Sequence, residues 1–84
     1  MSFELRWDLK AEEQLDKLPK EISIRIVKKV AQVAETGRGI EALKEFKYGH
    51  KIRVGDYRAL VDVYYDPDLI VVRVVDHRGK IYKR

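Results

Sequence analysis

Apolar residues in the first part of the chain recur at two spacings, and each spacing predicts a different element. Residues 3–7 alternate apolar and polar positions, which is typical of a half-buried strand. Residues 9–18 carry apolar residues three and four positions apart, which predicts a short amphipathic helix. Asp8 is expected to cap that helix, and Pro19 to end it, because the residue before a proline avoids the helical conformation.

A second, longer helix is expected from Pro19 to about Glu35, with Gly37 as its left-handed stop. Its apolar stripe consists of Ile22, Ile26, Val30 and Val33, broadened by Val27, Ala31 and Ala34. The basic residues beside the stripe are Arg25, Lys28 and Lys29. These cations are compatible with a solvated helix face or with contact to nucleic acid. Likewise, the apolar residues of the helix pair fit either core packing or a partner groove.

The second half of the chain returns to alternation and predicts a sheet. Strands are expected at residues 50–54, 57–65 and 69–76. The last of these has apolar residues on both of its faces, as in a central strand. Residues 42–46 are expected to cap the sheet edge as a helical turn or a loop. The order is β-α-α-β-β-β, with two helices on one face of a small, mainly antiparallel twisted sheet. This is an α+β fold, expected as one domain over residues 1–84.

A two-residue connection, Gly55-Asp56, predicts a tight hairpin with a type II′ turn. The resulting register places Val54 opposite Tyr57, Arg53 opposite Arg58, and Lys51 opposite Leu60. Two arginines then lie side by side, and like charges in that position destabilise a sheet by a few tenths to about 1 kcal/mol. A bound anion would relieve the repulsion. A solvated face with splayed side chains is the alternative.

The face of the sheet that the helices leave uncovered, the open face, gathers the candidate functional residues. It is expected to carry Lys51, Arg53, Arg58 and Arg73, and to point at His77. A cationic, partly apolar surface of this kind is typical of a docking site for a polyanion. Arg73 is as well placed to pair with Asp62 or Asp76 as to bind an anion.

Composition narrows the chemistry further. The chain of 84 residues has no cysteine and only two histidines, far apart, so neither a structural metal nor a cofactor is expected. The net charge of +4 and the pI of about 9.4 favour an acidic partner or nucleic acid. No apolar run has the length of a membrane span and the start does not read as a signal peptide, so we expect a cytoplasmic protein without a membrane partner.

A phosphodiester fits the expected open face, because arginine matches phosphate oxygens with two parallel hydrogen bonds. Cations on a rigid sheet would stabilise charge that develops in a transition state. Cleavage of RNA also needs proton transfer, for which the candidates are Tyr82, His77 and Lys51. The alternatives are that Tyr82 is a strand residue half-packed on the core, and that His77 is a surface histidine without a catalytic role.

Three motifs together resemble the RelE/ParE superfamily of toxins from toxin–antitoxin pairs. They are Leu18-Pro19-Lys20 between the helices, the hairpin Lys51–Arg58, and His77-Arg78 followed by Tyr82. The resemblance spans nearly the whole chain, and the Val-Gly-Asp-Tyr-Arg hairpin is fairly specific to the superfamily. The chain departs from the family pattern at His50, where tyrosine is frequent, and at Asp76, where a small residue is usual.

The resemblance implies an activity and a set of site residues. RelE-like toxins are ribosome-dependent mRNA endonucleases that cleave without a metal, by attack of the 2′-hydroxyl on the adjacent phosphate. The positions that the resemblance implies are Lys51, Arg53, Arg58, Arg78 and Tyr82 for catalysis, and Arg73, His77 and Lys80 for substrate binding. Arg53 and Arg58 would stabilise the phosphate and Arg78 would serve the leaving side. Tyr82 would orient or deprotonate the 2′-hydroxyl, or stack on a base.

The resemblance also implies partners. A RelB-like antitoxin is expected to cover the basic face in a toxin–antitoxin hetero-oligomer, with the ribosome and mRNA as targets. ParE-like members instead inhibit DNA gyrase by protein binding and generally lack the full catalytic set, so a gyrase inhibitor is the alternative. A plain binding module with a toxin-like fold is a third hypothesis, which predicts that overexpression does not slow growth.

Overall fold

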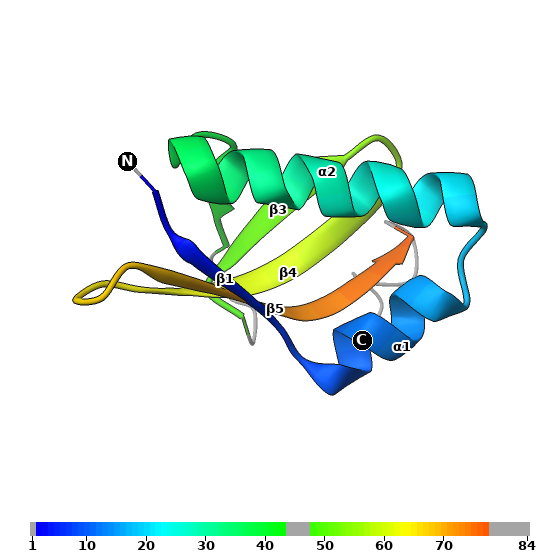
Figure 1. Cartoon of the computed structure of the whole chain (residues 1–84), viewed down its shortest axis with the longest axis horizontal. Coiled ribbons are helices and arrows are strands. Elements are labelled where there is room, and N and C mark those ends of the chain that lie inside the picture. The colour runs from blue at the N-terminus through cyan, green and yellow to red at the C-terminus, as the bar shows by residue number, and fades with distance from the viewer. Residues whose placement is uncertain (1, 44–47, 78–84) are drawn as a thin grey trace.

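The computed structural model shows two helices packed on a five-stranded sheet, as the α+β prediction requires (Figure 1). It describes residues 2–43 and 48–77, with only the backbone of Asp76. The elements in chain order are β1 (Glu4–Trp7), α1 (Leu9–Asp16), α2 (Lys20–Thr36), β2 (Ile40–Ala42), β3 (His50–Val54), β4 (Tyr57–Tyr64) and β5 (Leu69–His77). In Figure 1, α2 lies across the sheet and α1 lies beside β5. No helix within the described ranges is long and apolar enough to cross a membrane.

The helices form largely where the spacing predicted them. The stripe of α2 is in the main core, with Ile26 and Val30 almost fully buried. The chain leaves α2 at Gly37, whose φ of 74° allows its N–H to bond the carbonyl of Val33 at 2.7 Å. Val27 is a correction: it was expected to broaden the buried stripe, yet it is 41% exposed. Ala31 is exposed as well.

The strand order in the sheet is β1-β5-β4-β3-β2. The three predicted antiparallel strands β3, β4 and β5 are in its middle, and β1 and β2 pair with them at the two edges. β1 pairs with β5 in parallel, so the first strand lies beside the last. The short β2 pairs with β3, where only a loop was expected over residues 36–40. Of the segment expected to cap the sheet edge, residues 44–47 lie outside the described part of the chain.

The β3–β4 hairpin has the register predicted from its two-residue turn. Arg53 is opposite Arg58, and Lys51 is opposite Leu60. Gly55 has a φ of 59°, whereas Asp56 is not in the positive-φ region, and this combination identifies a type II′ turn. One glycine at the first central position was therefore enough to fix the pairing of both strands.

A bulge in β5 reverses the alternation that the sequence suggested. Leu60 pairs with Val74 and Val61 pairs with Val72, so Arg73 is the extra residue between them. The backbone N–H of Val75, just past the bulge, donates to Oε1 of Gln14 on α1 at 2.6 Å. The helix thereby supplies a partner next to a place where the strand ladder is disrupted.

The bulge also corrects the prediction for His77. This residue pairs with Tyr57, and the two rings meet edge to face with centroids 5.4 Å apart. Tyr57 packs against the main core under the helices. Because paired residues share a face, His77 lies on the helix side of the sheet and does not face the same way as Arg58.

The open face is less bare than expected. Leu60 and Val74 are 2% and 3% exposed, and Leu43 and Tyr48 pack against them as a second, smaller apolar cluster. Parts of the chain between β2 and β3 thus cover the middle of this face. The polar groups on the open face are separated into two ends by this cluster.

Candidate functional site

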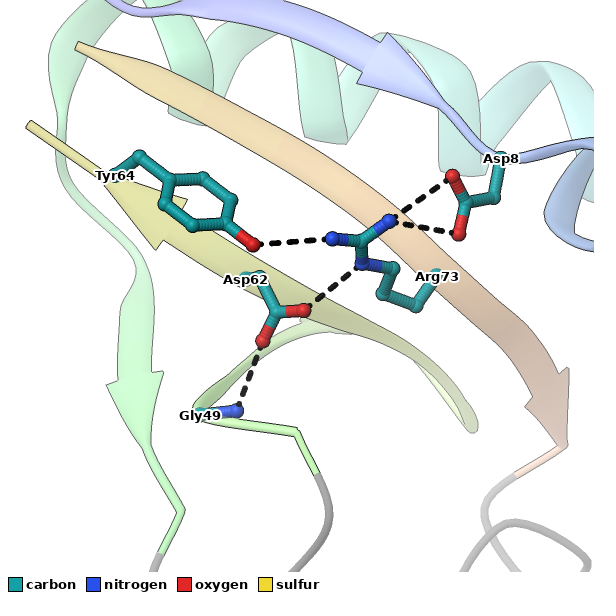
Figure 2. A network of polar contacts seen from close by, with 5 residues as sticks. All are labelled: Asp8, Gly49, Asp62, Tyr64 and Arg73. Atoms are coloured by element: carbon teal, nitrogen blue, oxygen red, sulfur yellow. Dashed lines mark hydrogen bonds and ion pairs between the residues drawn. The ribbon is translucent and has the colours of Figure 1, made fainter.

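Arg73 is the centre of a polar network at one end of the open face (Figure 2). Its Nε donates to Asp62 at 2.8 Å, and its Nη1 donates to both carboxylate oxygens of Asp8, at 3.1 and 3.0 Å. Nη2 donates to the hydroxyl of Tyr64 at 3.1 Å. All three nitrogens of the guanidinium therefore have a partner within the chain.

These contacts favour the charged form of the arginine. The hydrogen bonds that Arg73 donates to Asp62 and then to Asp8 raise the pKa of Arg73 above its ordinary value, against a smaller opposing effect of burial. The network links three elements, because Asp8 lies between β1 and α1, Asp62 belongs to β4, and Arg73 belongs to β5. The sequence left Arg73 either paired with Asp62 or Asp76 or bound to substrate. The structure shows the pairing with Asp62, and a role in substrate binding stays a prediction.

Asp8 does not cap α1 with its side chain, although the sequence predicted that it would. It occupies the N-cap position of α1, but its side chain makes no capping hydrogen bond. Its carboxylate binds Arg73, which is 65 residues away in the chain. The parallel pairing of Trp7 with Val72, together with the bond from the Asp8 N–H to the carbonyl of Val72 at 2.9 Å, brings the two residues together. Without knowledge of that pairing, the sequence gives no signal for this contact.

Asp62 extends the network towards the β3 side of the sheet. Its Oδ1 accepts a long hydrogen bond of 3.4 Å from the N–H of Gly49, just before β3 (Figure 2). Gly49 in turn accepts a bond from the N–H of Leu43 at 2.9 Å through its carbonyl. Asp62 thereby helps to fix the chain next to Tyr48, which packs on the small apolar cluster.

Arg58, at the hairpin end, was expected as an exposed cation on the open face but is only 5% exposed. Its Nη1 donates to the carbonyls of Gly55 and Tyr57, at 3.2 and 3.1 Å, so the guanidinium folds back over its own turn. Its Nε is buried without a hydrogen-bond partner. The described contacts of the Arg58 guanidinium are therefore with backbone carbonyls, and the residue opposite Arg58 on β5 is Asp76.

Arg53 and Lys51 are the more accessible cations of the hairpin. The side chain of Arg53 is 57% exposed, and its Nε lies 3.8 Å from Glu41 on β2, which is a long and weak ion pair. Lys51 is half-buried and pairs with Glu41 in the ladder and with Leu60 across the hairpin. The structure therefore brings Lys51, Arg53 and Arg58 together, and separates them from Arg73 and His77. Arg78, Lys80 and Tyr82 lie outside the described residues.

An apolar groove between α1 and α2, the α1–α2 groove, is a second functional candidate. Three of its side chains are strongly exposed for their type, namely Leu9 at 71%, Ile24 at 44% and Val27 at 41%. The groove consists of two pockets that share Leu15, Asp16 and Val27, and its other lining residues are Trp7, Glu12, Glu13, Ser23 and Lys28. Exposed apolar side chains that gather in one place usually mark a protein interface. The sequence signal was the apolar excess of the two helices, which had been assigned mainly to the core.

Two helices packed on a mixed five-stranded sheet form the fold of small toxins of the RelE/ParE type. The family model for the ParE toxin of the type II toxin–antitoxin system parDE matches residues 5–82. The chain therefore belongs to this family, and the predicted superfamily is confirmed. A comparison with curated protein sequences found no match.

Solved structures of RelE toxins share the fold. The toxin–antitoxin complex RelBE2 of Mycobacterium tuberculosis matches with a TM-score of 0.82 and 27% identity, covering 94% of this chain and 94% of that chain. The archaeal RelE–RelB complex of Pyrococcus horikoshii matches with a TM-score of 0.77 and 18% identity, over 95% and 99% of the two chains. A mutant of the E. coli toxin RelE in the free state matches with a TM-score of 0.76 and 22% identity, over 99% and 93%. At these identities the latter two show the fold alone.

Proposed function

We propose that this type II toxin is a ribosome-dependent endoribonuclease that cleaves mRNA, with the chain acting as one toxin domain. The observation that carries the proposal is the hairpin, which sets Arg53 directly opposite Arg58 with Lys51 beside them. Three cations at one end of a rigid sheet suit a substrate that gains negative charge as it reacts. The likeness to the RelBE2 complex, at a TM-score of 0.82, supports the choice of a RelE-type activity.

The reaction would be an intramolecular transfer within the RNA. The 2′-hydroxyl oxygen attacks the adjacent phosphorus while the bond to the leaving 5′-oxygen breaks, which gives a 2′,3′-cyclic phosphate and a 5′-hydroxyl. One proton leaves the 2′-hydroxyl and one is delivered to the 5′-oxygen, so no other reactant is consumed. His77 lies on the helix side of the sheet, so Tyr82 and Lys51 are the proposed candidates for proton transfer. Arg78 is the cation proposed for the leaving side.

Arg58 and Arg53 would act differently on the phosphate. Arg53 is exposed and can contact a phosphate oxygen directly. Arg58 is buried, so it acts through the field of its fixed charge unless it swings away from the carbonyls of Gly55 and Tyr57. A fixed charge needs no reorganisation as the transition state forms, which makes a buried arginine effective at a distance.

A RelB-like antitoxin would be the partner in a toxin–antitoxin hetero-oligomer. The matched complexes from M. tuberculosis and P. horikoshii each contain an antitoxin. The exposed Leu9, Ile24 and Val27 of the α1–α2 groove offer an apolar surface that a helix of such a partner would cover. The basic open face would be shielded by the same partner.

The test is to add purified protein to translating ribosomes and to map the 5′ ends of the mRNA. Wild type is expected to produce new ends, and Arg58→Ala is expected to reduce cleavage about 100-fold or more, as for removal of one transition-state donor. Arg58→Lys, which keeps the charge, should retain more activity. Arg38→Ala, at an exposed loop position, is the control and should cleave like wild type. Absence of new ends with wild type, or equal cleavage by Arg58→Ala, would overturn the proposal.

The second candidate is a ParE-like inhibitor of DNA gyrase, which the description of the matched family model favours. In that case the same cations would form a protein-docking surface and no RNA would be cleaved. A supercoiling assay with purified gyrase separates the two functions. Inhibition of supercoiling with intact mRNA would establish the gyrase inhibitor, and intact supercoiling with cleaved mRNA would establish the ribonuclease.

A further inference from the structure

A basic groove runs between α2 and the end of β3, next to the hairpin turn. We call it the α2–β3 groove. It is lined by Arg25, Lys28, Lys29, Gln32, Arg53, Val54 and Gly55. Among these described residues four side chains are cationic and none is acidic. Arg25, Lys28, Lys29 and Gln32 are exposed on α2, and Arg53 reaches the groove from β3.

The helix arranges its three cations on one surface. Lys28 and Lys29 follow Arg25 by three and four positions, and residues with these spacings are neighbours on a helix, about 5–6 Å apart at their Cβ atoms. Arg25 lies over the hairpin turn, because a Cβ added to Gly55 would be 3.2 Å from its Nη2. Within the described part of the chain, none of the three forms an ion pair, in contrast to Arg73 with its two carboxylates.

Arg53 joins this groove to the hairpin end of the open face. It pairs with Arg58 across the hairpin, and its side chain also lines the groove with Arg25 and Lys29. The cations therefore form a strip that passes around the β3 edge, from the open face to α2. A flexible chain of phosphates can follow such a strip, whereas a compact anion would contact only one part of it.

We infer that the α2–β3 groove binds the phosphodiester backbone of single-stranded RNA and extends the contact that begins at the open face. Five of its seven lining residues carry polar or charged side chains, four of them cationic, whereas the pocket on the other side of Lys28 is lined mainly by apolar surface. A groove with this charge favours a polyanion over an amphipathic protein helix. No aromatic side chain is among the described residues that line it, so it offers no surface for base stacking and would not select a sequence. The choice of RNA over another polyanion rests on the proposed function.

Binding of a labelled uridine homopolymer of about 20 nucleotides to the full chain tests this inference, by fluorescence anisotropy between about 50 and 200 mM salt. Each lost phosphate contact of a single strand lowers the slope of log affinity against log salt by about 0.7, so Lys28→Ala/Lys29→Ala should lower it by about 1.4 and weaken binding roughly tenfold. The matched control is Lys10→Ala/Lys17→Ala, which removes the same charge from exposed positions of the other helical segment. Urea unfolding of both double variants checks that the fold is retained.

Three outcomes decide the matter. A groove variant that binds as wild type does, or a control that loses as much affinity as the groove variant, overturns the inference. So does displacement of the RNA by a glutamate homopolymer at equal charge concentration, because the groove would then be a docking site for acidic protein. Failure of the proposed function is distinguishable: wild type would then bind the homopolymer through Lys28 and Lys29 but leave mRNA intact on ribosomes.

Discussion

Arg58 and Arg73 were both expected as cations on the open face, and the structure gives them different partners. Each guanidinium nitrogen of Arg73 donates a hydrogen bond to a side chain, and the carboxylates of Asp8 and Asp62 are its main acceptors. Arg58 donates hydrogen bonds from Nη1 to two backbone carbonyls at its own turn, those of Gly55 and Tyr57. Carboxylates neutralise the charge of Arg73 and tie three elements together, whereas the described partners of Arg58 are uncharged carbonyls, which leave its positive charge in place.

The largest difference between the two arginines should appear in the free energy of unfolding when Arg73 or Arg58 is replaced by methionine, which has an unbranched side chain without a charge. Arg73→Met leaves two carboxylates without their cation, and we expect it to lower the free energy of unfolding by about 2–3 kcal/mol. Urea unfolding measures this loss. Arg53→Met serves as the control, since its exposed ion pair at 3.8 Å contributes about 0.5 kcal/mol or less. A loss no larger for Arg73→Met than for the control would contradict the structural role.

The two carboxylates should contribute unequally to the same network. Asp62→Ala removes the partner of Arg73 Nε and of the Gly49 N–H, and should cost about 1.5 kcal/mol. Asp8→Ala should cost about 1 kcal/mol, because the side chain of Asp8 is 42% exposed and water replaces part of its contact. Since both bind Arg73, the double variant should not show the sum of the two effects. Strict additivity would mean that Arg73 does not couple them.

Arg58→Met should change stability by less than about 1 kcal/mol, because the removal of a buried charge offsets the loss of its hydrogen bonds. The carbonyl of Gly55 is at an exposed position, where water can take over. Measuring both the stability and the mRNA cleavage of this variant tests the difference between Arg58 and Arg73 most directly. We expect it to fold like wild type and to lose activity, whereas Arg73→Lys, which keeps the charge near the carboxylates, should retain activity.

The smallest effect concerns pH. A raised pKa of Arg73 in the folded state means that its stabilisation is fully present below the unfolded pKa and is lost only as pH rises through the still higher folded pKa. Between about pH 6 and 10 the arginine therefore stays charged in both states. The stability difference between wild type and Arg73→Met should be flat across that window in urea unfolding. A marked slope there would point to a different titrating partner.

The hairpin shows how much of the fold local sequence can specify. Gly55 supplied the positive φ of a two-residue turn, and the turn then determined every pair from Val54–Tyr57 to Lys51–Leu60. The apolar stripe of α2 was predicted from equally local spacing, apart from Val27 and Ala31, which are exposed. These features depend on residues a few positions apart, so their physical cause is visible in the sequence.

The site could be predicted only in part, because its decisive contacts are not local. The bulge at Arg73 shifts the alternation of β5, and nothing in the residues from 69 to 77 marks it. The bond between Asp8 and Arg73 depends on the parallel pairing of β1 with β5. Arg58 was placed on the correct strand and opposite the correct residue, but its burial follows from how its side chain folds over the turn.

The position of β5 between β1 and β4 has a consequence for how the protein is made. A chain leaves the ribosome from its first residue onwards, so β1 emerges long before the strand that it must lie against. Until residues 69–77 are available, β1 lacks the strand beside which it lies in the sheet, and Asp8 lacks its partner Arg73. The sheet is completed by a contact between distant segments, which is a slow kind of folding step. The sheet of the nascent chain is therefore completed only after residues 69–77 have been synthesised.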